Sequence, residues 1–242
     1  MTTFVKILLG ILLGALLNSC KADINYGSGI KGNKNVITKT RNLNKDFSKI
    51  SASEGLEVIL SQNNENSIKV QADENLHQYI ITEVIDETLK LHTSEQLGKA
   101  EAKKIYVNFK TLSDIKSSSG ASIKSSNEIN ANKISIKATS GSKQNIYVAS
   151  ENLYCSSSSG ASINLKGKSN IIKATSSSGS SINAIELLSS SCKTNTSSGA
   201  SIKVYCSSEI NSTASSGSSI KFDGNPKQIS INKSSGARIS IY

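Results

Sequence analysis

The sequence predicts an all-β protein, a parallel β-helix (solenoid) whose repeats are about 20 residues long. The phrase Ser-Ser-Gly-Ala-Ser-Ile at residues 118–123 returns with variations around six later glycines. The steps from Gly120 onward are 21, 19, 19, 20, 18 and 19 residues. The six later glycines are Gly141, Gly160, Gly179, Gly199, Gly217 and Gly236. Apolar and polar residues alternate within each repeat.

The columns of the repeat indicate two strands joined at the glycine. Apolar residues predominate seven and five positions before each glycine and three and five positions after it. All these positions are odd, so they share one face of each strand. The even positions are polar, with Ser or Thr two before, mostly Ser two after, and Lys or Asn four after in most repeats. A flat antiparallel sheet is the alternative, but it gives no reason for a glycine at this fixed interval.

The glycine is interpreted as a corner, because it adopts backbone angles that a β-carbon forbids. Its small neighbours, Ser before and Ala or Ser after, are expected because two walls converge there. Repeats of equal length should stack in register at about 4.8 Å, since one repeat cannot bury its own apolar face. Residues 223–226 predict a turn at the opposite corner.

Residues 1–19 have the features of a lipoprotein signal peptide. Lys6 precedes an apolar run from Ile7 to Leu17, which is shorter than the roughly 20 residues that span a bilayer. The run ends in Leu-Asn-Ser-Cys, which resembles a bacterial lipobox and predicts lipidation (palmitate) at Cys20. The partner is then the membrane, through the N-terminal lipid. The alternative is an ordinary signal peptide with an incidental cysteine.

Residues 20–42 are expected to form a flexible tether, and residues 43–242 the β-helix domain, with regular repeats from about residue 114. Within 43–113, period-2 alternation predicts half-buried strands. Residues 79–85 are more continuously apolar and are expected to be buried on both faces. Residues 73–77 predict one helical turn, and residues 95–104 a polar loop.

Two parts of the chain resemble the DUF2807 family, the putative auto-transporter adhesin head GIN domain, which is abundant in Bacteroidota. The first is a set of phrases that includes Gly32-Asn33, Phe47-Ser48-Lys49-Ile50 and Gly55-Leu56-Glu57-Val58; the second is the Ser-Gly array. The resemblance covers roughly residues 32–242. It implies a right-handed β-helix in a secreted or anchored envelope protein, and no catalytic residues. The residue after the cysteine is Lys21, as in lipoproteins that are sent to the outer membrane and not retained at the inner membrane. Lys21-Ala22-Asp23 resembles the short charged tag that sends some Bacteroidota lipoproteins to the cell surface.

The cysteines beyond Cys20 leave two alternatives open. Cys155 and Cys192 occupy core columns about two turns apart, beyond the reach of a disulfide. Cys192 and Cys206 flank one corner, so they are either a disulfide or a pair of buried thiols. No histidine lies near them in sequence, so no metal site is predicted.

The sequence contains no recognisable catalytic site, and no cofactor is expected. His77 and His92 are the histidines, and no nucleophile elbow accompanies the serines. The acids of the repeats do not pair as glycan hydrolysis requires. The net charge of +10 comes without the interleaved aromatics of a nucleic-acid interface, so no nucleic-acid partner is expected.

We therefore expect a non-enzymatic lipoprotein of the cell envelope, at the outer membrane, acting as an adhesin or scaffold. Exposure at the cell surface and a periplasmic location are the two alternatives for its orientation. The alternative is a carbohydrate-binding or glycan-processing β-helix protein. A surface glycan or a protein is the expected ligand, and Tyr154 is one of the few outward aromatics available to a sugar. Because residues 239–242 end within a strand pattern, end-to-end self-association is a further expectation.

Overall fold

The computed structural model describes residues 29–43 and 45–242. The expected signal peptide and Cys20 lie outside these residues. Within the described part, no helix is long and apolar enough to cross a membrane. The chain there consists of strands and one short 3-10 helix, Glu74–Leu76, which confirms the predicted helical turn.

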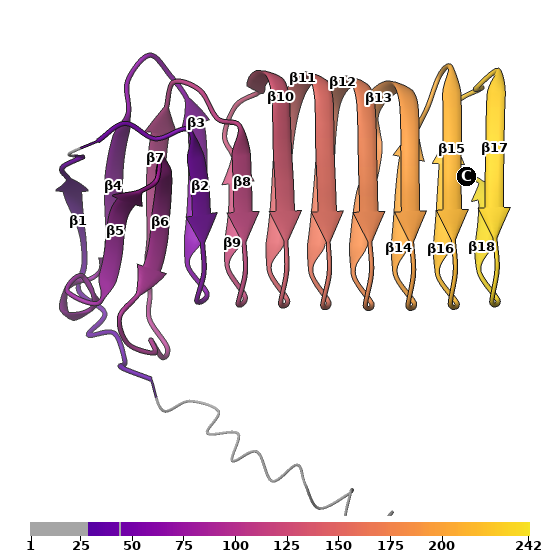
Figure 1. Ribbon diagram of the computed structural model, residues 1–242. Coiled ribbons are helices and arrows are strands. Elements are labelled where there is room, and N and C mark those ends of the chain that lie inside the picture. Colours follow the sequence, from indigo (N-terminus) through magenta and orange to yellow (C-terminus); the bar gives the residue numbers. More distant parts are fainter. Residues whose placement is uncertain (1–28, 44) are drawn as a thin grey trace, which may run out of the picture.

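The strands form a stack of coils, as the sequence predicts (Figure 1). Their bounds are β1 Val36–Arg41, β2 Lys49–Ala52, β3 Glu57–Gln62, β4 Ser67–Asp73, β5 Ile80–Ile85, β6 Thr88–Thr93, β7 Lys103–Phe109, β8 Asp114–Ser117, β9 Ser122–Ser125, β10 Ile129–Ala138, β11 Lys143–Ser157, β12 Ser162–Ser176, β13 Ser181–Thr196, β14 Ser201–Tyr205, β15 Glu209–Ala214, β16 Ser219–Asp223, β17 Gln228–Lys233 and β18 Arg238–Ile241.

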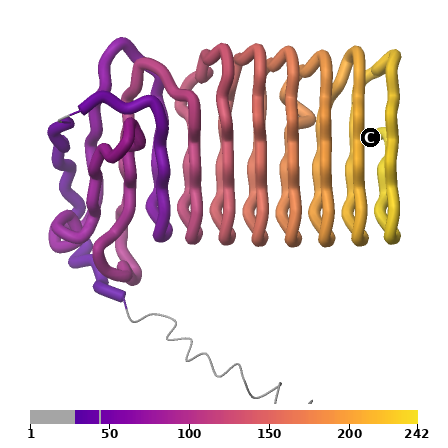
Figure 2. Tube along the Cα trace, in the orientation of Figure 1, coloured from indigo at the N-terminus to yellow at the C-terminus, as the bar shows by residue number. Residues whose placement is uncertain are grey.

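Two parallel walls enclose the core. Wall A contains the segments that lead into the glycine corners, namely β2, β8, the second parts of β10–β13, β15 and β17, and also β6, which pairs with β2. Wall B contains the segments that leave these corners, namely β3, β9, the first parts of β11–β13, β14, β16 and β18, and also β7, which pairs with β3. Residues 94–102 connect β6 to β7 in place of a glycine corner. Strands β11–β13 continue over the opposite corner, here called the upper corner, and the coils stack at even intervals (Figure 2).

The apolar columns of the sequence lie between the walls. Ile115, Ile136, Ile163, Ile202 and Ile220 are all almost completely buried. The parallel register places equivalent residues of successive coils side by side, so Ile163 pairs with Ile182 and Ile182 pairs with Ile202. Burying one such side chain stabilises the fold by roughly 1.5–3 kcal/mol, so the continuous column holds the stack together.

The glycine corners are tight turns in which two successive residues have positive φ. Ser178 and Gly179, for example, have φ of 53° and 68°. Each corner hydrogen-bonds to the next: the Gly179 N–H donates to the Ser198 carbonyl at 3.0 Å. A Cβ at Gly179 would meet nothing within 4 Å, so lack of space does not require this glycine. Its positive φ does, which confirms the backbone reason that we gave for the corner glycine.

Crowding does explain the residue after each corner glycine, because that residue points inward. Ala121, Ser142, Ala161, Ser180 and Ala200 are all buried. Buried hydroxyls pair there: Ser117 Oγ donates to Ser142 Oγ at 2.8 Å, and Ser176 and Ser180 are hydrogen-bonded at 2.9 Å. These serines stand at odd positions, three before or one after a corner glycine, so the alternation also places them inside, where they hold the interior of the corner.

The regular stack begins earlier in the chain than residue 114. Glu54 and Gly55 have φ of 60° and 68° and form the same corner between β2 and β3. The Gly55 N–H donates to the Ser119 carbonyl at 3.0 Å. This coil lies between the β6–β7 coil and the β8–β9 coil, so the order in space departs from the order in sequence.

The N-terminal end of the stack is closed by antiparallel strands. β4 pairs with β7, and β1 pairs with β4 from Val36–Asp73 to Arg41–Ile68. Residues 36–41 are thus a strand, not the tether we expected, because they satisfy the backbone of an otherwise open edge. β5 pairs with β6 alone among the named strands, and Ile85 is exposed, so residues 79–85 are not buried on both faces as expected.

At the other end lie β17 and β18. Ile229, Ile231 and Ile241 are exposed on this coil. End-to-end self-association stays a prediction.

Candidate functional site

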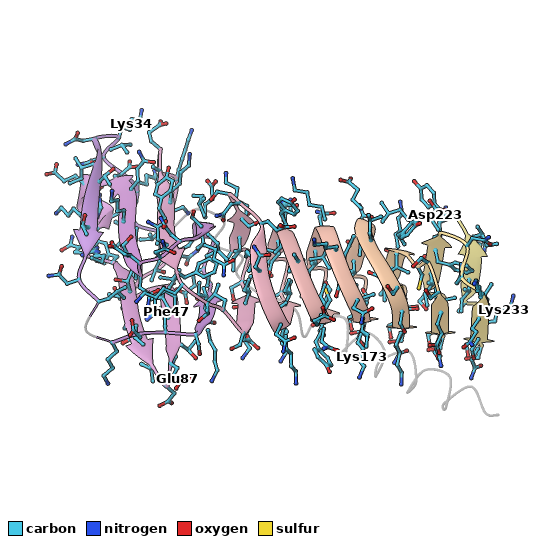
Figure 3. The ribbon with its side chains drawn as sticks, turned by 90° about the horizontal axis from the view of Figure 1, so that it is seen from above. Lys34, Phe47, Glu87, Lys173, Asp223 and Lys233 are labelled. Carbon is cyan, nitrogen blue, oxygen red and sulfur yellow. The ribbon has the colours of Figure 1, made fainter. Side chains whose placement is uncertain are left out.

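The outward faces of both walls are polar, and each carries lysines. Lys173 of wall A and Asp223 of wall B point away from the stack on opposite sides (Figure 3). On wall B, the column four positions after each corner glycine faces outward. It comprises Lys124, Asn145, Asn164, Asn183, Lys203, Lys221 and Ser240.

Wall B is hollowed over the middle of this column. The hollow has a volume of about 410 Å³, within the size range of small-ligand sites. We call it the asparagine hollow. Its lining comprises Lys124, Ser125, Asn145, Ile146, Tyr147, Asn164, Leu165, Lys166, Asn183 and Glu186.

A β-bulge lies at one side of the hollow. β12 and β13 are in register at Asn164 and Asn183, but Lys166 pairs with Glu186. β13 therefore holds one residue more than β12 here, which bends a strand and increases its twist. The same extra residue accounts for the step of 20 between Gly179 and Gly199 after two steps of 19. The spacing carried this signal, although sequence reasoning did not interpret it.

The asparagines form a ladder across three coils. Asn164 Nδ2 donates to Asn145 Oδ1 at 2.9 Å. Asn183 continues the ladder in register with Asn164, and its Oδ1 is buried without a hydrogen-bond partner. Each of the three coils thus contributes one asparagine side chain whose amide group can contact a ligand.

Tyr147 forms an aromatic part of the lining. Lys166 Nζ lies 5.0 Å from the centre of its ring. Gly167, with φ of 114°, leaves room for the ring, because a Cβ there would come within 3.1 Å of it and overlap the Val148 carbonyl oxygen. The glycine is therefore required by this close approach.

The charges around the hollow are mainly positive. Lys124 Nζ contacts Glu57 Oε1 at 2.9 Å, and this hydrogen bond raises the pKa of Lys124 above its usual value. Lys166 and Glu186 complete the charged groups of the lining. Lys203 continues the asparagine column on the next coil.

A second concavity crosses the upper corner over β10–β13. This open groove has a volume of about 860 Å³. Leu188, which is 59% exposed, forms part of its lining. The other lining residues are Asn130, Ala131, Asn132, Ala149, Ser150, Glu151, Lys168, Ser169, Asn170 and Ser190.

Tyr154, the outward aromatic that we considered for sugar contacts, lies on wall A between two lysines. Lys133 and Lys173, from the preceding and following coils, place their Nζ atoms 5.1 and 5.2 Å from the ring centre. The two lysine side chains cover the Tyr154 ring through cation–π contacts, so the ring is not open for a sugar to stack on.

Cys155, Cys192 and Cys206 are buried free thiols. Cys192 Sγ donates to the Tyr205 carbonyl oxygen at 3.4 Å, and Cys206 Sγ donates to the Glu209 carbonyl oxygen at 2.8 Å. The neighbouring Cys206 thiol, together with burial, raises the pKa of Cys192, and the Cys192 thiol lowers the pKa of Cys206. Burial raises the pKa of Cys155. The alternative disulfide between Cys192 and Cys206 stays a prediction.

The two histidines lie on the N-terminal coils and apart from both concavities. His77 is buried, with its Nε2 3.2 Å from the Ile37 carbonyl oxygen. His92 pairs with Glu83 at 3.1 Å. No group of three potential metal ligands gathers within residues 29–43 and 45–242.

The fold and these faces define a β-solenoid that presents polar surfaces on a rigid stack. The chain belongs to the DUF2807 family, described as putative auto-transporter adhesin, head GIN domain, which matches residues 46–226. No curated protein matches the chain.

Solved structures share the fold. A putative adhesin from Bacteroides fragilis is 21% identical, with a TM-score of 0.82 over 88% of this chain and 100% of its own. A putative lipid binding protein from Parabacteroides distasonis is also 21% identical, with a TM-score of 0.69 over 87% of this chain and 98% of its own. A putative adhesin from Parabacteroides merdae is 17% identical, with a TM-score of 0.71 over 88% and 98%.

Proposed function

We propose that the protein is a non-enzymatic adhesin of the cell envelope, held to the membrane by a lipid on Cys20. One observation carries the proposal: the coils repeat a polar, lysine-bearing outer surface on a rigid stack, and this surface is hollowed at the upper-corner groove and at the asparagine hollow. A stack of this kind presents the same chemistry many times along one direction, which suits contact with a repeating polymer or another cell surface.

The acids of the concavities favour binding over catalysis. Glu186 is the carboxylate in the asparagine hollow and Glu151 is the carboxylate in the upper-corner groove, among the described lining residues. Glycoside hydrolysis ordinarily uses two carboxyl groups that flank the scissile bond. A single carboxylate in each of these two concavities supports the non-enzymatic proposal. A further hollow of about 560 Å³ contains Glu54 and Glu95, but Glu54 already accepts a hydrogen bond from the Thr93 hydroxyl at 2.9 Å.

An adhesion assay tests the function. Beads coated with the full chain are incubated with mucin-coated surfaces and with epithelial cells, and their retention under flow is compared with albumin-coated beads. We expect retention above the albumin level on at least one of these surfaces. Retention at the albumin level on both would overturn the adhesin proposal.

The anchor is tested separately in cells. Cys20→Ser should move the protein from the membrane fraction to the soluble fraction, because the lipid chains provide the anchoring energy. Protease treatment of intact cells should digest the wild-type protein if it faces outward. Resistance in intact cells together with digestion after lysis would contradict a surface location.

A further inference from the structure

The side-chain amide oxygen of Asn183, Oδ1, is one of five buried side-chain polar atoms without a hydrogen-bond partner among the described residues. It is the one of the five that belongs to the lining of the asparagine hollow. Buried polar atoms are nearly always paired, since an unpaired one carries its full desolvation penalty. A hydroxyl group of a ligand bound in the hollow would supply the missing donor.

The ladder has the spacing of a chain of sugars. Asn145, Asn164 and Asn183 lie on successive coils, which stack at about 4.8 Å. One sugar unit of an extended β-linked glycan has a similar length, so a glycan parallel to the stack axis would present about one unit per asparagine. Amides can both donate to and accept from sugar hydroxyls.

The surrounding charges favour an acidic glycan over a neutral one. Lys124 precedes the asparagines in their column and Lys203 follows them, while Lys166 lies beside them. The opposing charges are Glu186 in the lining and Glu57, which pairs with Lys124, so three lysines face two carboxylates. Lysines at both ends of the ladder would attract carboxylate groups on the terminal units of the glycan.

We propose that the asparagine hollow binds an extended acidic oligosaccharide, with its hydroxyls on the ladder of Asn145, Asn164 and Asn183. The inference deepens the adhesin proposal and rests on it. Binding is non-covalent, and the glycan is released unchanged.

Calorimetry with the full chain in detergent tests the site. The probes are hexasaccharides of β-1,4-linked mannuronate and of β-1,4-linked mannose, which differ by the carboxylate. We expect binding of mannuronate, and weaker binding of mannose. The double substitution Asn145→Ala/Asn164→Ala should weaken mannuronate binding by about tenfold or more, because it removes ligand hydrogen bonds.

The matched control is Asn195→Ala/Asn211→Ala, which removes two exposed asparagines from adjacent coils of wall A. It should bind mannuronate as the wild type does. Equal weakening in both double variants would overturn the assignment to the hollow, and so would the absence of binding to both hexasaccharides at millimolar concentration.

Asn183→Leu separates binding from folding. If the unpaired oxygen is kept for a ligand, its removal should abolish binding while the melting temperature stays unchanged or rises. A fall in melting temperature with binding intact would show a purely structural role and contradict the proposal. Bead adhesion that survives in Asn145→Ala/Asn164→Ala would leave the adhesin function standing while overturning this site.

Discussion

Asp73 Oδ2 accepts a hydrogen bond from the Lys34 backbone N–H at 2.8 Å. The other oxygen of the same carboxylate accepts from the backbone N–H groups of Glu101 and Ala102, both at 3.0 Å. Gly32 lies so close that a Cβ would overlap the carboxylate. One buried side chain thus joins the segment before β1 to the segment before β7.

Asp73→Ala should lower the free energy of unfolding by about 3 kcal/mol, because one buried and two partly buried N–H groups lose a charged acceptor. Urea unfolding measures the change. Glu65→Ala, which removes an exposed acid, is the control and should have little effect. A loss for Asp73→Ala no larger than that of the control would contradict the role of this carboxylate.

Acid should weaken the same contact. Burial raises the pKa of Asp73, but the hydrogen bonds from Ala102, Lys34 and Glu101 outweigh it and hold the pKa below its usual value. The stabilisation is therefore complete above about pH 4, the pKa of an unfolded Asp, and is lost as the pH falls toward the lower folded pKa. Unfolding measured from pH 5 to pH 2 should show a steeper loss in the wild type than in Asp73→Ala.

His77 should make the N-terminal cap sensitive to mildly acidic pH. Burial lowers the pKa of His77, and the Ile37 carbonyl only partly offsets this effect. The unfolded chain then binds the proton more readily, so stability is full above about pH 6.5 and declines below it. Hydrogen exchange in β1, compared with the intrinsic exchange rate at each pH, should show less protection at pH 5 than at pH 7 in the wild type. An equal loss of protection in His77→Gln would rule out this histidine as the cause.

Two glycines should respond differently to alanine. Gly179→Ala meets open space and costs only the left-handed backbone, about 1–2 kcal/mol. Gly167→Ala would also overlap the Val148 carbonyl and press on Tyr147, so it should destabilise the protein more. Thermal unfolding compares the two variants. A larger loss in Gly179→Ala than in Gly167→Ala would contradict the open space at the corner glycine.

The three buried thiols should be inert in the folded protein. Burial raises the pKa of Cys155, and Cys206 is shielded from solvent although Cys192 lowers its pKa. A water-soluble thiol reagent should therefore react only after the protein is unfolded in denaturant. An intact mass lower by two hydrogen atoms, with protection lost in Cys192→Ser, would instead demonstrate the disulfide.

The sequence by itself determined the repeating architecture of this protein. Its odd and even columns separate core from surface, because strand side chains alternate and equal repeats must stack. It also placed Asn145, Asn164 and Asn183 in one outward column. Cys192 and Cys206 were brought face to face by the same count.

The tertiary structure alone decided the order of the N-terminal coils, the strand Val36–Arg41, and the hollow over the asparagines. The coil of Gly55 lies beside strands that follow it far along the chain, and alternation carries no information on which distant strands pair. β1 depends on the open edge of β4, and the hollow depends on a bulge in β13 beside its neighbour. Such features arise between segments, so their physical cause is absent from any one segment of the sequence.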